Sequence, residues 1–360
     1  MVNKTPSGLD IKKGDDCSAN AFSWAKTTFK NRPQDQGNII LGDKKSYSSL
    51  LRFGNEKIGI TSDGIGTKIE LAERLQKYDT LGFDLVAMVA DDLVTVGLEP
   101  TSLSNILDVD HLDQTIINSL MQGLAAACAY ANISMTGGEI AELGNRVGGY
   151  GNQMHFNWAA TAIGVLPPSL SQAIDGTQIE KDHVVLALQS DGFRSNGFSL
   201  VRKVMQAAFG DEWHQVTYNK TTTWGEKLLT PSKIYTPFIQ ALVQSKIELT
   251  GVAHITGGGI LQNLNRILEP NQKGAVLNNL FAPHDTMQQL IDIGNLTEKE
   301  AYLYWNMGNG MLLVAPKNQV ADIKKIAVQQ HYKVQVAGVV TDQSTIDLQT
   351  YTGQYLQANI

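Results

Sequence analysis

The sequence predicts a mixed α/β (α+β) protein built from two domains, and three observations support this. Its 360 residues are about twice the ~150 residues of an average domain. Short β-branched runs, glycine-rich loops and helical patterns recur in that order in both halves, as in layered α/β folds. A double proline, Pro167-Pro168, ends a strand-like run and precedes a polar stretch. We therefore predict one domain at residues 1–166 and a second at residues 167–360.

The first predicted elements follow the order strand, loop and helix. Lys57–Thr61 alternates as a strand does, Ser62–Lys68 (SDGIGTK) has the composition of a loop, and residues 69–78 have helical spacing. Helical spacing returns over residues 83–96, where Asp84 is the expected N-cap and the pattern ends before a glycine. This order predicts a strand that leads through a glycine loop into two helices.

The remainder of the first half adds a longer helix and two strands. The helix is expected from about Asp113 to Ala131, with its apolar residues on one face. A short strand, Ile133–Thr136, leads into a second glycine-rich loop, Gly137–Gly144. After the polar, glycine-rich stretch Gly148–Asn157, Trp158–Leu166 has the pattern of a strand.

The second half repeats this order. Its expected strands are His183–Leu188, Gly251–Thr256, Gly310–Val314 and Val334–Val340, and the last two are expected to close the domain. Two glycine loops, Ser190–Gly197 (SDGFRSNG) and Gly257–Gly259, each follow a strand. Helical patterns at residues 198–209 and 260–268 come directly after these loops.

Composition excludes several classes of protein. With 29 Lys+Arg against 35 Asp+Glu the net charge is −6, which argues against a duplex-binding module because such a module needs a basic face. Cys17 and Cys128 lie far apart, so neither a disulfide scaffold nor a thiolate metal cluster is expected. The sequence shows no signal-peptide core and no apolar run of membrane-spanning length. We expect a cytoplasmic protein that binds neither nucleic acid nor membrane.

The 33 glycines cluster in a few loops between strands and helices. Such loops leave backbone N–H groups free to face an anion, and the positive end of the following helix dipole favours phosphate. The alternative, to which we give equal weight for any one loop, is that each glycine only permits a tight turn with a positive φ. Neither GxGxxG nor the GxxxxGK[ST] of a P-loop is present, so the two common nucleotide motifs do not apply.

Three acids stand beside these loops and could hold a divalent cation. Asp63 follows the first strand, Asp92 lies among apolar neighbours of the helical pattern, and Glu139 follows two glycines. A carboxylate on an apolar stripe needs a cation or dense hydrogen bonding, and Mg²⁺ prefers a few carboxylates with phosphate oxygens. Asp91 falls on a more polar arc of the same helix as Asp84. Spacing alone favours the alternative that these acids are caps and surface residues.

Two further positions could act on phosphates or protons. Thr67 and Lys68 close the first loop and could bind phosphates, although an exposed lysine is the ordinary alternative. His254 lies three residues before the triple glycine, where it is either catalytic or a structural histidine of the core. The seven histidines form no HxxxH or HxxH pair, so no zinc site is expected.

Several longer motifs occur in a fixed order along nearly the whole chain. They are SGLDIKKGD (Ser7–Asp15), SDGIGTK (Ser62–Lys68), GFDLVAMVADDLV (Gly82–Val94), GLEP (Gly97–Pro100), TGGEIAEL (Thr136–Leu143), SNGFSLVRK (Ser195–Lys203), LLTPSKIY (Leu228–Tyr235), HITGGG (His254–Gly259) and WNMGNGM (Trp305–Met311). This ordered set resembles the phosphoribosylformylglycinamidine cyclo-ligases, the aminoimidazole ribonucleotide synthetases of purine biosynthesis. A single motif would be a weak match, whereas the ordered set is specific.

The resemblance implies a fold and an activity. The family has a two-domain fold, in which an N-terminal mixed sheet forms a barrel within a homodimer and the C-terminal domain is an α/β sandwich. Its reaction is an ATP-dependent ring closure. ATP phosphorylates the amide oxygen of formylglycinamidine ribonucleotide, and a neighbouring nitrogen then attacks that carbon to close the imidazole, with release of ADP and phosphate. The resemblance thus implies an enzyme that uses ATP and Mg²⁺ on a small-molecule substrate.

The resemblance also implies roles for individual residues. Mg²⁺ would be bound by Asp63, Asp92 and Glu139, and the reacting centre would involve His254, Glu139 and Arg194. The residues implied in binding the nucleotide and substrate phosphates are Asp63, Gly64, Gly66, Thr67, Lys68, Asp92, Gly137, Gly138, Ser195, Asn196, Gly197, Gly257 and Gly258.

The chain departs from the family pattern at several places. Asp35–Leu51 has only two glycines where the family has a long glycine-rich stretch, and residues 144–157 also differ. Asp91 replaces an asparagine, and Arg194 replaces a histidine. Arg194 could bind a phosphate with two hydrogen bonds, but it cannot act as a base near neutral pH. An alternative is therefore a paralogue of the same superfamily that phosphorylates another small molecule or binds ATP without catalysis.

Overall fold

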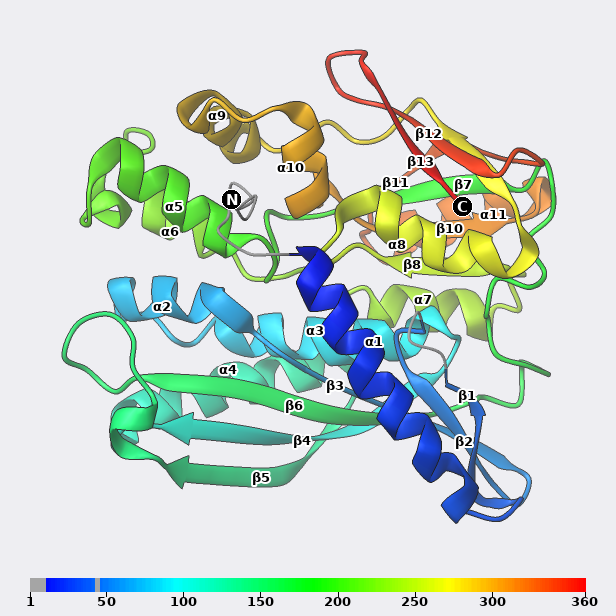
Figure 1. The fold of residues 1–360 in the computed structure, drawn as a ribbon, viewed down its shortest axis with the longest axis horizontal. Coiled ribbons are helices and arrows are strands. Elements are labelled where there is room, and N and C mark those ends of the chain that lie inside the picture. Colours follow the sequence, from blue (N-terminus) through cyan, green and yellow to red (C-terminus); the bar gives the residue numbers. More distant parts are fainter. Residues whose placement is uncertain (1–10, 43–45) are drawn as a thin grey trace.

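Two sheets with helices between them make up the computed structural model, which describes residues 11–42 and 46–360 (Figure 1). Residues 7–10 of the first family motif, and residues 43–45 of the divergent segment Asp35–Leu51, lie outside the described residues. Among the described helices, none is long and apolar enough to cross a membrane.

The first sheet is mixed and has the order β1-β2-β3-β6-β4-β5. Its strands are β1 (Gln36–Leu41), β2 (Ser49–Phe53), β3 (Glu56–Gly64), β4 (Glu99–Val109), β5 (Ser134–Glu142) and β6 (Phe156–Val165). β4 and β5 are parallel, and the other neighbours are antiparallel. Helices α3 (Leu81–Thr95) and α4 (Gln114–Ala131) pack on one face of this sheet, and α2 (Ile69–Leu75) follows the loop after β3.

The second sheet has the order β13-β12-β9-β11-β7-β10-β8, in which only the β12–β9 pair is parallel among the described strands. Its strands are β7 (Val184–Gln189), β8 (Gly251–His254), β9 (Gly274–Leu277), β10 (Asn309–Ala315), β11 (Val334–Thr341), β12 (Thr345–Gln349) and β13 (Tyr355–Asn359). Its helices are α5 (Phe198–Phe209), α6 (Trp224–Leu228), α7 (Thr236–Gln244), α8 (Gly259–Leu268), α9 (Asp285–Gly294), α10 (Glu298–Tyr304) and α11 (Val320–Gln329). Helix α1 (Ile11–Thr28) crosses the front of the molecule in Figure 1.

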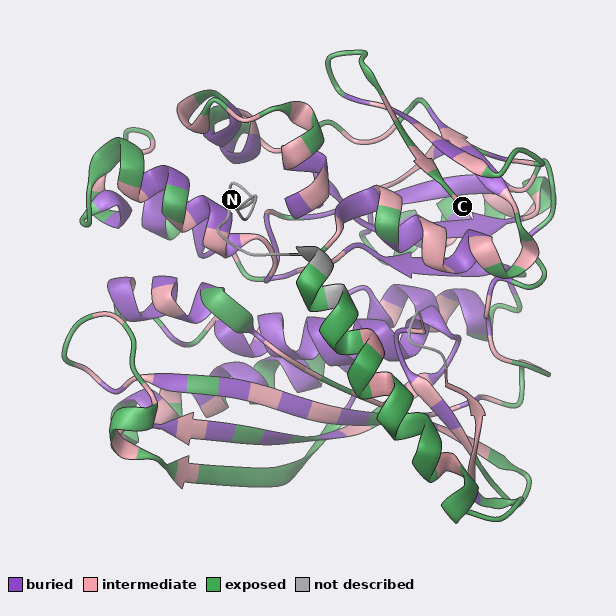
Figure 2. Ribbon diagram, viewed as in Figure 1, coloured by how far each residue is buried: buried purple, intermediate pink, exposed green. Residues whose placement is uncertain are grey.

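Helix α3 lies between the two sheets. It is buried along nearly its whole length because its residues are apolar on almost every side, which is typical of a helix enclosed by other elements (Figure 2). It contacts β3 and β6 of the first sheet and β8 and α7 of the second half. Three aspartates of this helix, Asp84, Asp91 and Asp92, are buried as well. Their carboxylates therefore need polar partners inside the molecule.

Most elements predicted from the sequence are confirmed, and α5 begins and ends where its pattern predicts. The prediction that Asp84 caps its helix is wrong. Helix α3 begins at Leu81, after Thr80, and Asp84 lies in its first turn. The Asp84 carboxylate is buried against Lys68, with Nζ 2.7 Å from Oδ1, so its partner is a cation from another element and not the helix end.

The prediction of a glycine loop at Gly137–Gly144 is also wrong, because β5 continues through Glu142 in parallel pairing with β4. The sequence analysis did not identify β4 as a strand. At Gly138 the two strands are so close that a Cβ atom would lie 2.3 Å from the carbonyl oxygen of Asn105. This glycine thus permits close strand pairing. The second sheet likewise does not end near Val340, since β12 and β13 follow.

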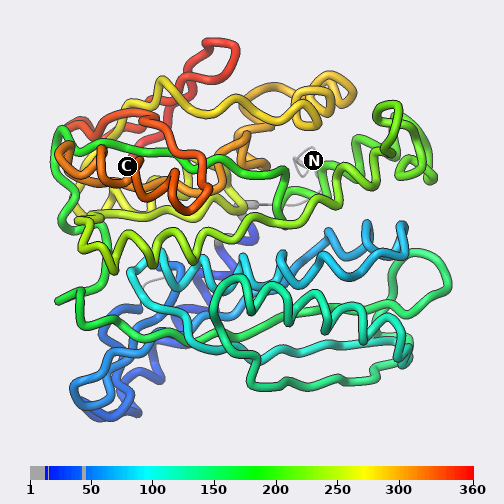
Figure 3. Tube along the Cα trace, turned by 180° about the vertical axis from the view of Figure 1, so that it is seen from behind, coloured from blue at the N-terminus to red at the C-terminus, as the bar shows by residue number. Residues whose placement is uncertain are grey.

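The face of the first sheet opposite α3 and α4 carries exposed apolar side chains. Ile60 and Ile163 pair across β3 and β6 and are each 40% exposed, and Ile106 on β4 is 52% exposed. The described helices that pack most closely on this sheet, α3 and α4, lie on its other side (Figures 1 and 3). Within the described residues, β5 is an edge strand of the sheet. Large apolar side chains exposed on the open face of a sheet are typical of an interaction surface.

Candidate functional site

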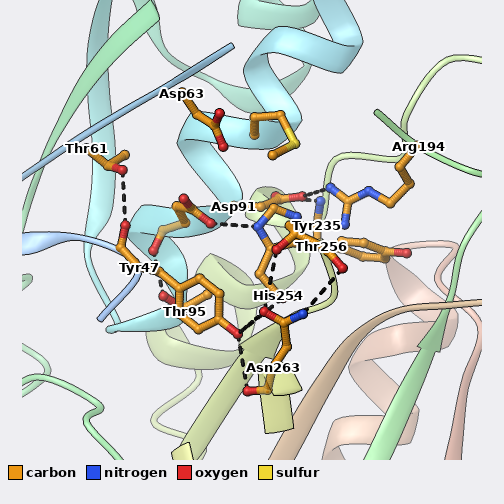
Figure 4. A network of polar contacts seen from close by, with 12 residues as sticks. Tyr47, Thr61, Asp63, Asp91, Thr95, Arg194, Tyr235, His254, Thr256 and Asn263 are labelled. Carbon is orange, nitrogen blue, oxygen red and sulfur yellow. Dashed lines mark hydrogen bonds and ion pairs between the residues drawn. The ribbon is translucent and has the colours of Figure 1, made fainter. Parts of the chain in front are cut away.

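A buried polar network joins the two halves of the chain around α3 (Figure 4). In this view His254 lies between Tyr47 and Arg194, with Asp63 above them. The network draws on both sheets and on loops that are distant in sequence.

Asp92 and His254 form the centre of this network. His254 Nδ1 lies 2.7 Å from Asp92 Oδ1, and the ring is fully buried at the end of β8. Burial, and then the positive charges of Arg194 and Arg266, hold the pKa of His254 well below its usual value, so the ring is neutral. With Nδ1 donating to Asp92, Nε2 has no hydrogen-bond partner among the described residues. Nε2 is thus a buried nitrogen whose lone pair is unpaired among these residues.

Asp63 lies near the end of β3 on the same side of the sheet as α3. Its neighbours across the sheet are Ala160 and Asn105, which are buried. Its Oδ1 accepts the N–H of Gly64 at 2.7 Å. Burial raises the pKa of Asp63, and burial together with the charge of Asp63 raises the pKa of Asp92 well above its usual value. The negative charge of Asp63 opposes the ionisation of Asp92, and a cation beside the two carboxylates would favour it.

These two carboxylates fit a magnesium ion. Mg²⁺ is usually held by one or two carboxylates together with phosphate oxygens and waters. The charges of Asp63 and Asp92 act on each other, so an ion between them would relieve their repulsion. Within residues 11–42 and 46–360, no group of three or more His, Cys, Asp or Glu side chains could hold a metal. An ion here would thus take its remaining ligands from water and from a bound phosphate.

Glu139 does not join this pair within the chain. It is exposed and pairs with Ile106 across β5 and β4, so the two side chains share the outer face of the sheet. Asp63 lies on the inner face. Gly137 and Gly138 belong to the same strand, and Gly137 has a φ of 131° with open space around it.

The loop after Asp63 divides into an accessible part and a buried part. Gly66 and Thr67 are exposed, and Gly66 has a left-handed φ of 72° with open space around it. Lys68 is fully buried, and its Nζ lies 2.7 Å from both Asp84 Oδ1 and the carbonyl oxygen of Thr230. The amino group of Lys68 therefore has protein partners, and the backbone of Gly66 and Thr67 is the part that a ligand can reach.

Arg194 is buried and faces α3. Its Nη2 lies 2.8 Å from Asp91 Oδ2, and its side chain is only 2% exposed. From helical spacing, Asp91 is expected on a more polar side of its helix. In the structure it is fully buried, and burial raises its pKa to about 6. The guanidinium of Arg194 thus binds a carboxylate of the protein.

The two glycine loops of the second half each stand at the start of a helix. Gly197 and Gly258 have left-handed φ values of 79° and 89° and directly precede α5 and α8, with Gly257 in the second of these turns. The first N–H groups of a helix have no partner within it and can bind an anion. Ser195 Oγ and Asn196 Nδ2 contact side chains of α3, at 3.4 Å and 3.8 Å.

Tyr47 is a member of the network that the sequence analysis missed. Its hydroxyl oxygen lies 3.2 Å from the carbonyl oxygen of His254 and 3.1 Å from Asn263 Oδ1, and its one proton can be donated to either. Its ring centre lies 4.8 Å from the guanidinium of Arg266. Tyr47 belongs to the divergent segment Asp35–Leu51, so no motif pointed to it. The fold alone brings it to His254, which is 207 residues away in sequence.

One hollow lies beside the loop of Gly66 and Thr67, and a second lies beside Tyr47 and Thr95 of the network. A groove of about 880 Å³ is lined by residues that include Gly66, Thr67, Arg146, Gly148, Gly149, Asn157 and Arg202. A cavity of about 670 Å³ is lined by Tyr47, Thr95, Arg266 and side chains of α1, among others. Both volumes are in the range of small-molecule sites.

Family models and relatives agree on what this chain is similar to. The models described as AIR synthase related protein match at residues 45–166 for the N-terminal domain and 180–350 for the C-terminal domain. A phosphoribosylformylglycinamidine cyclo-ligase of Methanobrevibacter smithii is 32% identical over 354 residues, which cover 98% of both chains. The chain belongs to the phosphoribosylformylglycinamidine cyclo-ligase family. A cyclo-ligase of Carboxydothermus hydrogenoformans is 37% identical over 93% of this chain and 95% of that relative. The resemblance inferred from the motifs is thereby confirmed.

Solved structures share the fold of this cyclo-ligase family member. A structure titled as a HypE–HypF complex matches with a TM-score of 0.63 at 15% identity, over 89% of this chain and 95% of that one. HypE in complex with ATP matches with a TM-score of 0.59 at 14% identity, over 84% and 85%. Phosphoribosylformylglycinamidine synthase II of Thermotoga maritima matches with a TM-score of 0.56 at 12% identity, over 91% and 46%. These likenesses, with the family models, confirm the mixed α/β fold predicted from the sequence.

Two of the departures from the cyclo-ligase pattern contact each other. Asp91 stands where the family motif has asparagine and Arg194 where it has histidine, and the two form the buried ion pair described above. The added negative charge and the added positive charge therefore compensate one another.

Proposed function

We propose that this chain closes the imidazole ring of formylglycinamidine ribonucleotide with ATP, the activity for which its relatives are named. The amide oxygen of the substrate attacks the γ-phosphorus of ATP, a new P–O bond forms, and the bond from that phosphorus to ADP breaks. The neighbouring nitrogen then attacks the amide carbon, and the C–O bond breaks to release phosphate. The protein must hold the reactants in line and balance the phosphate charge.

The observation that carries this proposal is the meeting of Asp63, Asp92 and His254 between the two halves. Asp63 and Asp92 would hold Mg²⁺, which offsets phosphate charge when bound. Asp92 has Oδ1 bonded to His254, and its second oxygen remains for the ion. Asp92 is buried and Asp63 is partly buried, so water screens these charges less and their interaction with a cation would be stronger.

His254 would take the proton that the attacking nitrogen loses. Its neutral ring has Nε2 free, and Asp92 holds the Nδ1 proton in place. A carboxylate in this position stabilises the imidazolium that forms when Nε2 is protonated. Arg194 cannot take this role, since a guanidinium keeps its proton near neutral pH.

The phosphates would lie along the groove beside Gly66 and Thr67. The exposed backbone there, with Arg146 on the groove wall, offers donors and positive charge to a triphosphate, whereas Arg202 on the same wall pairs with Glu70. The helix starts at Gly197 and Gly258 would receive the ribose phosphate of the substrate.

An assay of the purified chain tests the proposal. With formylglycinamidine ribonucleotide and Mg·ATP, ADP and aminoimidazole ribonucleotide should appear in equal amounts, and ADP should not accumulate without the substrate. If calorimetry shows ATP binding but no aminoimidazole product forms, the proposal fails in favour of a paralogue with another acceptor or none.

A second copy of the chain would cover the exposed face of the first sheet. Ile60, Ile106 and Ile163 give this face an apolar centre, and the unpaired edge at β5 is the kind of strand that another chain can extend. The family resemblance implies a homodimer joined through this sheet. Glu139 lies on the same face, so any part that it has in Mg²⁺ or nucleotide binding would depend on the dimer.

A further inference from the structure

Arg194 and Asp91 are held by more contacts than their ion pair alone. Besides the 2.8 Å contact between Arg194 Nη2 and Asp91 Oδ2, Arg194 Nη1 donates to the carbonyl oxygen of Gly310 at 3.0 Å. The guanidinium also lies 5.0 Å from the ring centre of Tyr235. Arg194 therefore joins the loop after β7 to α3 and to β10 at once.

Asp91 uses its other oxygen to hold the start of α7. Its Oδ1 accepts the N–H of Tyr235 at 2.8 Å, the N–H of Thr236 at 2.9 Å and the hydroxyl of Thr236 at 3.0 Å. Both carboxylate oxygens of Asp91 are thus bonded to the second half of the chain. Because the pair is buried, removing either partner leaves a charge without compensation in the interior.

The backbone of Arg194 is fixed in an unusual conformation. Its φ is 63°, in the left-handed region that residues with a side chain rarely adopt. Such a conformation persists where surrounding contacts hold it. Here the guanidinium contacts hold it together with the bonds of Ser195 to Asp84 and of Trp305 to Gly197. The ion pair therefore contributes to the direction in which the chain leaves Arg194 toward Ser195–Gly197.

Each member of the pair is adjacent in sequence to a residue of the proposed site. Asp91 precedes Asp92 on α3, and Arg194 precedes Ser195 in the glycine loop. The pair is therefore the direct link between the side of the site that carries Asp92 and His254 and the side that would receive the substrate phosphate.

We propose that Asp91 and Arg194 are positioning residues whose ion pair fixes the loop Ser195–Gly197 relative to Asp92. The proposal rests on the proposed function, since it assigns this loop to the substrate. Neither residue touches the reactants, and the two act as a unit, so a change at one position requires a matching change at the other.

The test compares four variants with the wild type. Arg194→Gln and Asp91→Asn each remove one charge, Asp91→Asn with Arg194→Gln removes both, and Arg194→Lys keeps the charge but cannot bond Asp91 and Gly310 together. The measurements are the melting temperature, kcat and KM for each substrate, and amide hydrogen exchange of residues 192–197. Hydrogen exchange reports on the loop whether or not the chain is active.

The single neutral variants should melt well below the wild type, and the double variant should melt closer to it than either, because no buried charge is left unpaired. The double variant and Arg194→Lys should lose about tenfold or more in kcat, with KM for Mg·ATP changed by less than about twofold, since Asp63 and Asp92 are intact. In both, residues 192–197 should exchange faster than in the wild type.

A surface ion pair outside these segments provides the control. Lys273 Nζ lies 2.8 Å from Asp342 Oδ1, with Asp342 56% exposed, so Asp342→Asn removes a charge pair without touching the interior. It should leave kcat and the exchange of residues 192–197 unchanged. Wild-type kcat in a folded Arg194→Lys or double variant, or unchanged loop exchange in both, overturns the positioning role. If the wild-type chain forms no aminoimidazole product, the proposed function is refuted instead. The hydrogen-exchange data would still decide whether the ion pair positions the loop.

Discussion

Single residues on α3 show how burial sets the chemistry of an acid. Asp84, Asp91 and Asp92 belong to one helix and are all buried, yet each is matched to a different group. Asp84 pairs with Lys68, Asp91 with Arg194 and Asp92 with His254. Of these three partners only the histidine ring leaves a nitrogen lone pair unpaired, which is why we propose His254 for the proton transfer.

Asp63→Asn should abolish Mg·ATP-dependent activity while the fold is kept. A neutral amide of the same shape removes a ligand charge of the proposed Mg²⁺ site, and kcat/KM should fall by about a hundredfold or more. The melting temperature should stay level or rise, because burial already raises the pKa of Asp63 and the amide has no charge to bury. Asp347→Asn, on β12 outside the network, is the control. Near-normal turnover by Asp63→Asn would place the metal site elsewhere.

His254→Ala should impair turnover more than nucleotide binding. The change removes the free Nε2 and leaves Asp92 without its donor, so kcat should drop by about two orders of magnitude or more. The affinity for Mg·ATP, measured by calorimetry, should change much less. His183→Ala, a half-buried histidine bonded to Thr250, controls for loss of an imidazole in the same half. Equal losses of turnover and binding in His254→Ala would instead indicate a structural histidine.

At the scale of elements, the glycine-rich segment of residues 148–155 is held by a buried acid of α2. Glu73 is 2% exposed, and its Oε2 accepts the N–H of Tyr150 at 2.9 Å, while Oε1 lies 3.4 Å from His155 Nδ1. The Tyr150 hydroxyl donates to Glu212 Oε1 at 2.7 Å. The segment, which forms one wall of the groove beside Gly66 and Thr67, is thus tied to both halves of the chain.

The melting temperature of Glu73→Gln should rise relative to that of the wild type as the pH increases. Burial raises the pKa of Glu73 above its ordinary 4.5, so the unfolded chain releases this proton first and the wild type loses stability as the pH rises through the raised value. Glutamine does not titrate and keeps an oxygen for the N–H of Tyr150. The difference between variant and wild type should therefore grow from pH 4.5 toward neutrality, in melting curves recorded across that range.

Glu212→Gln gives the opposite sign and serves as the comparison. The hydrogen bond from Tyr150 lowers the pKa of Glu212, so this group adds stability as the pH rises and glutamine forfeits that gain. A difference that does not vary with pH for Glu73→Gln would show that folding leaves the pKa of Glu73 at its ordinary value.

At the scale of the whole molecule, the two halves are joined through one buried layer. A single apolar cluster includes Trp158 of the first sheet and Val185 of the second, together with Leu93 of α3 and Leu264 of α8. The three acid pairs of α3 lie within this layer. The division at residues 166 and 167 stays a prediction about domains, and a shared core of this extent leads us to expect that the halves unfold together.

Ile106→Glu should convert a dimer into a monomer. It places a charge in the centre of the exposed face of the first sheet, where it would have no partner at an apolar interface. Light scattering coupled to size exclusion should give twice the chain mass for the wild type and one chain mass for the variant, with equal helix content by circular dichroism. Val328→Glu, at a 75% exposed position on α11, should remain dimeric. A monomeric wild type would contradict the homodimer proposal outright.

Strands and helices with a clear local pattern could be predicted, and those that depend on long-range pairing could not. The spacing of apolar residues marked α5 and α4 because a helix carries its own hydrogen bonds. Strand β4 and the continuation of β5 were not predicted, because their hydrogen bonds form only between segments that are far apart in sequence. The glycines of β5 therefore suggested a phosphate loop where the chain forms a strand.

The order of motifs by itself determined the family and the mixed α/β class, since such patterns are carried by neighbouring residues. Tertiary structure alone decided which acids meet which partners. Asp92 and His254 are 162 residues apart, and Asp91 and Arg194 are 103 apart, so no local pattern could pair them. The same folding turned Glu139 to the outer face of its sheet and Asp63 to the inner face. The physical reason is that burial removes water as an alternative partner, so the geometry of the packed interior determines the partner of each charge.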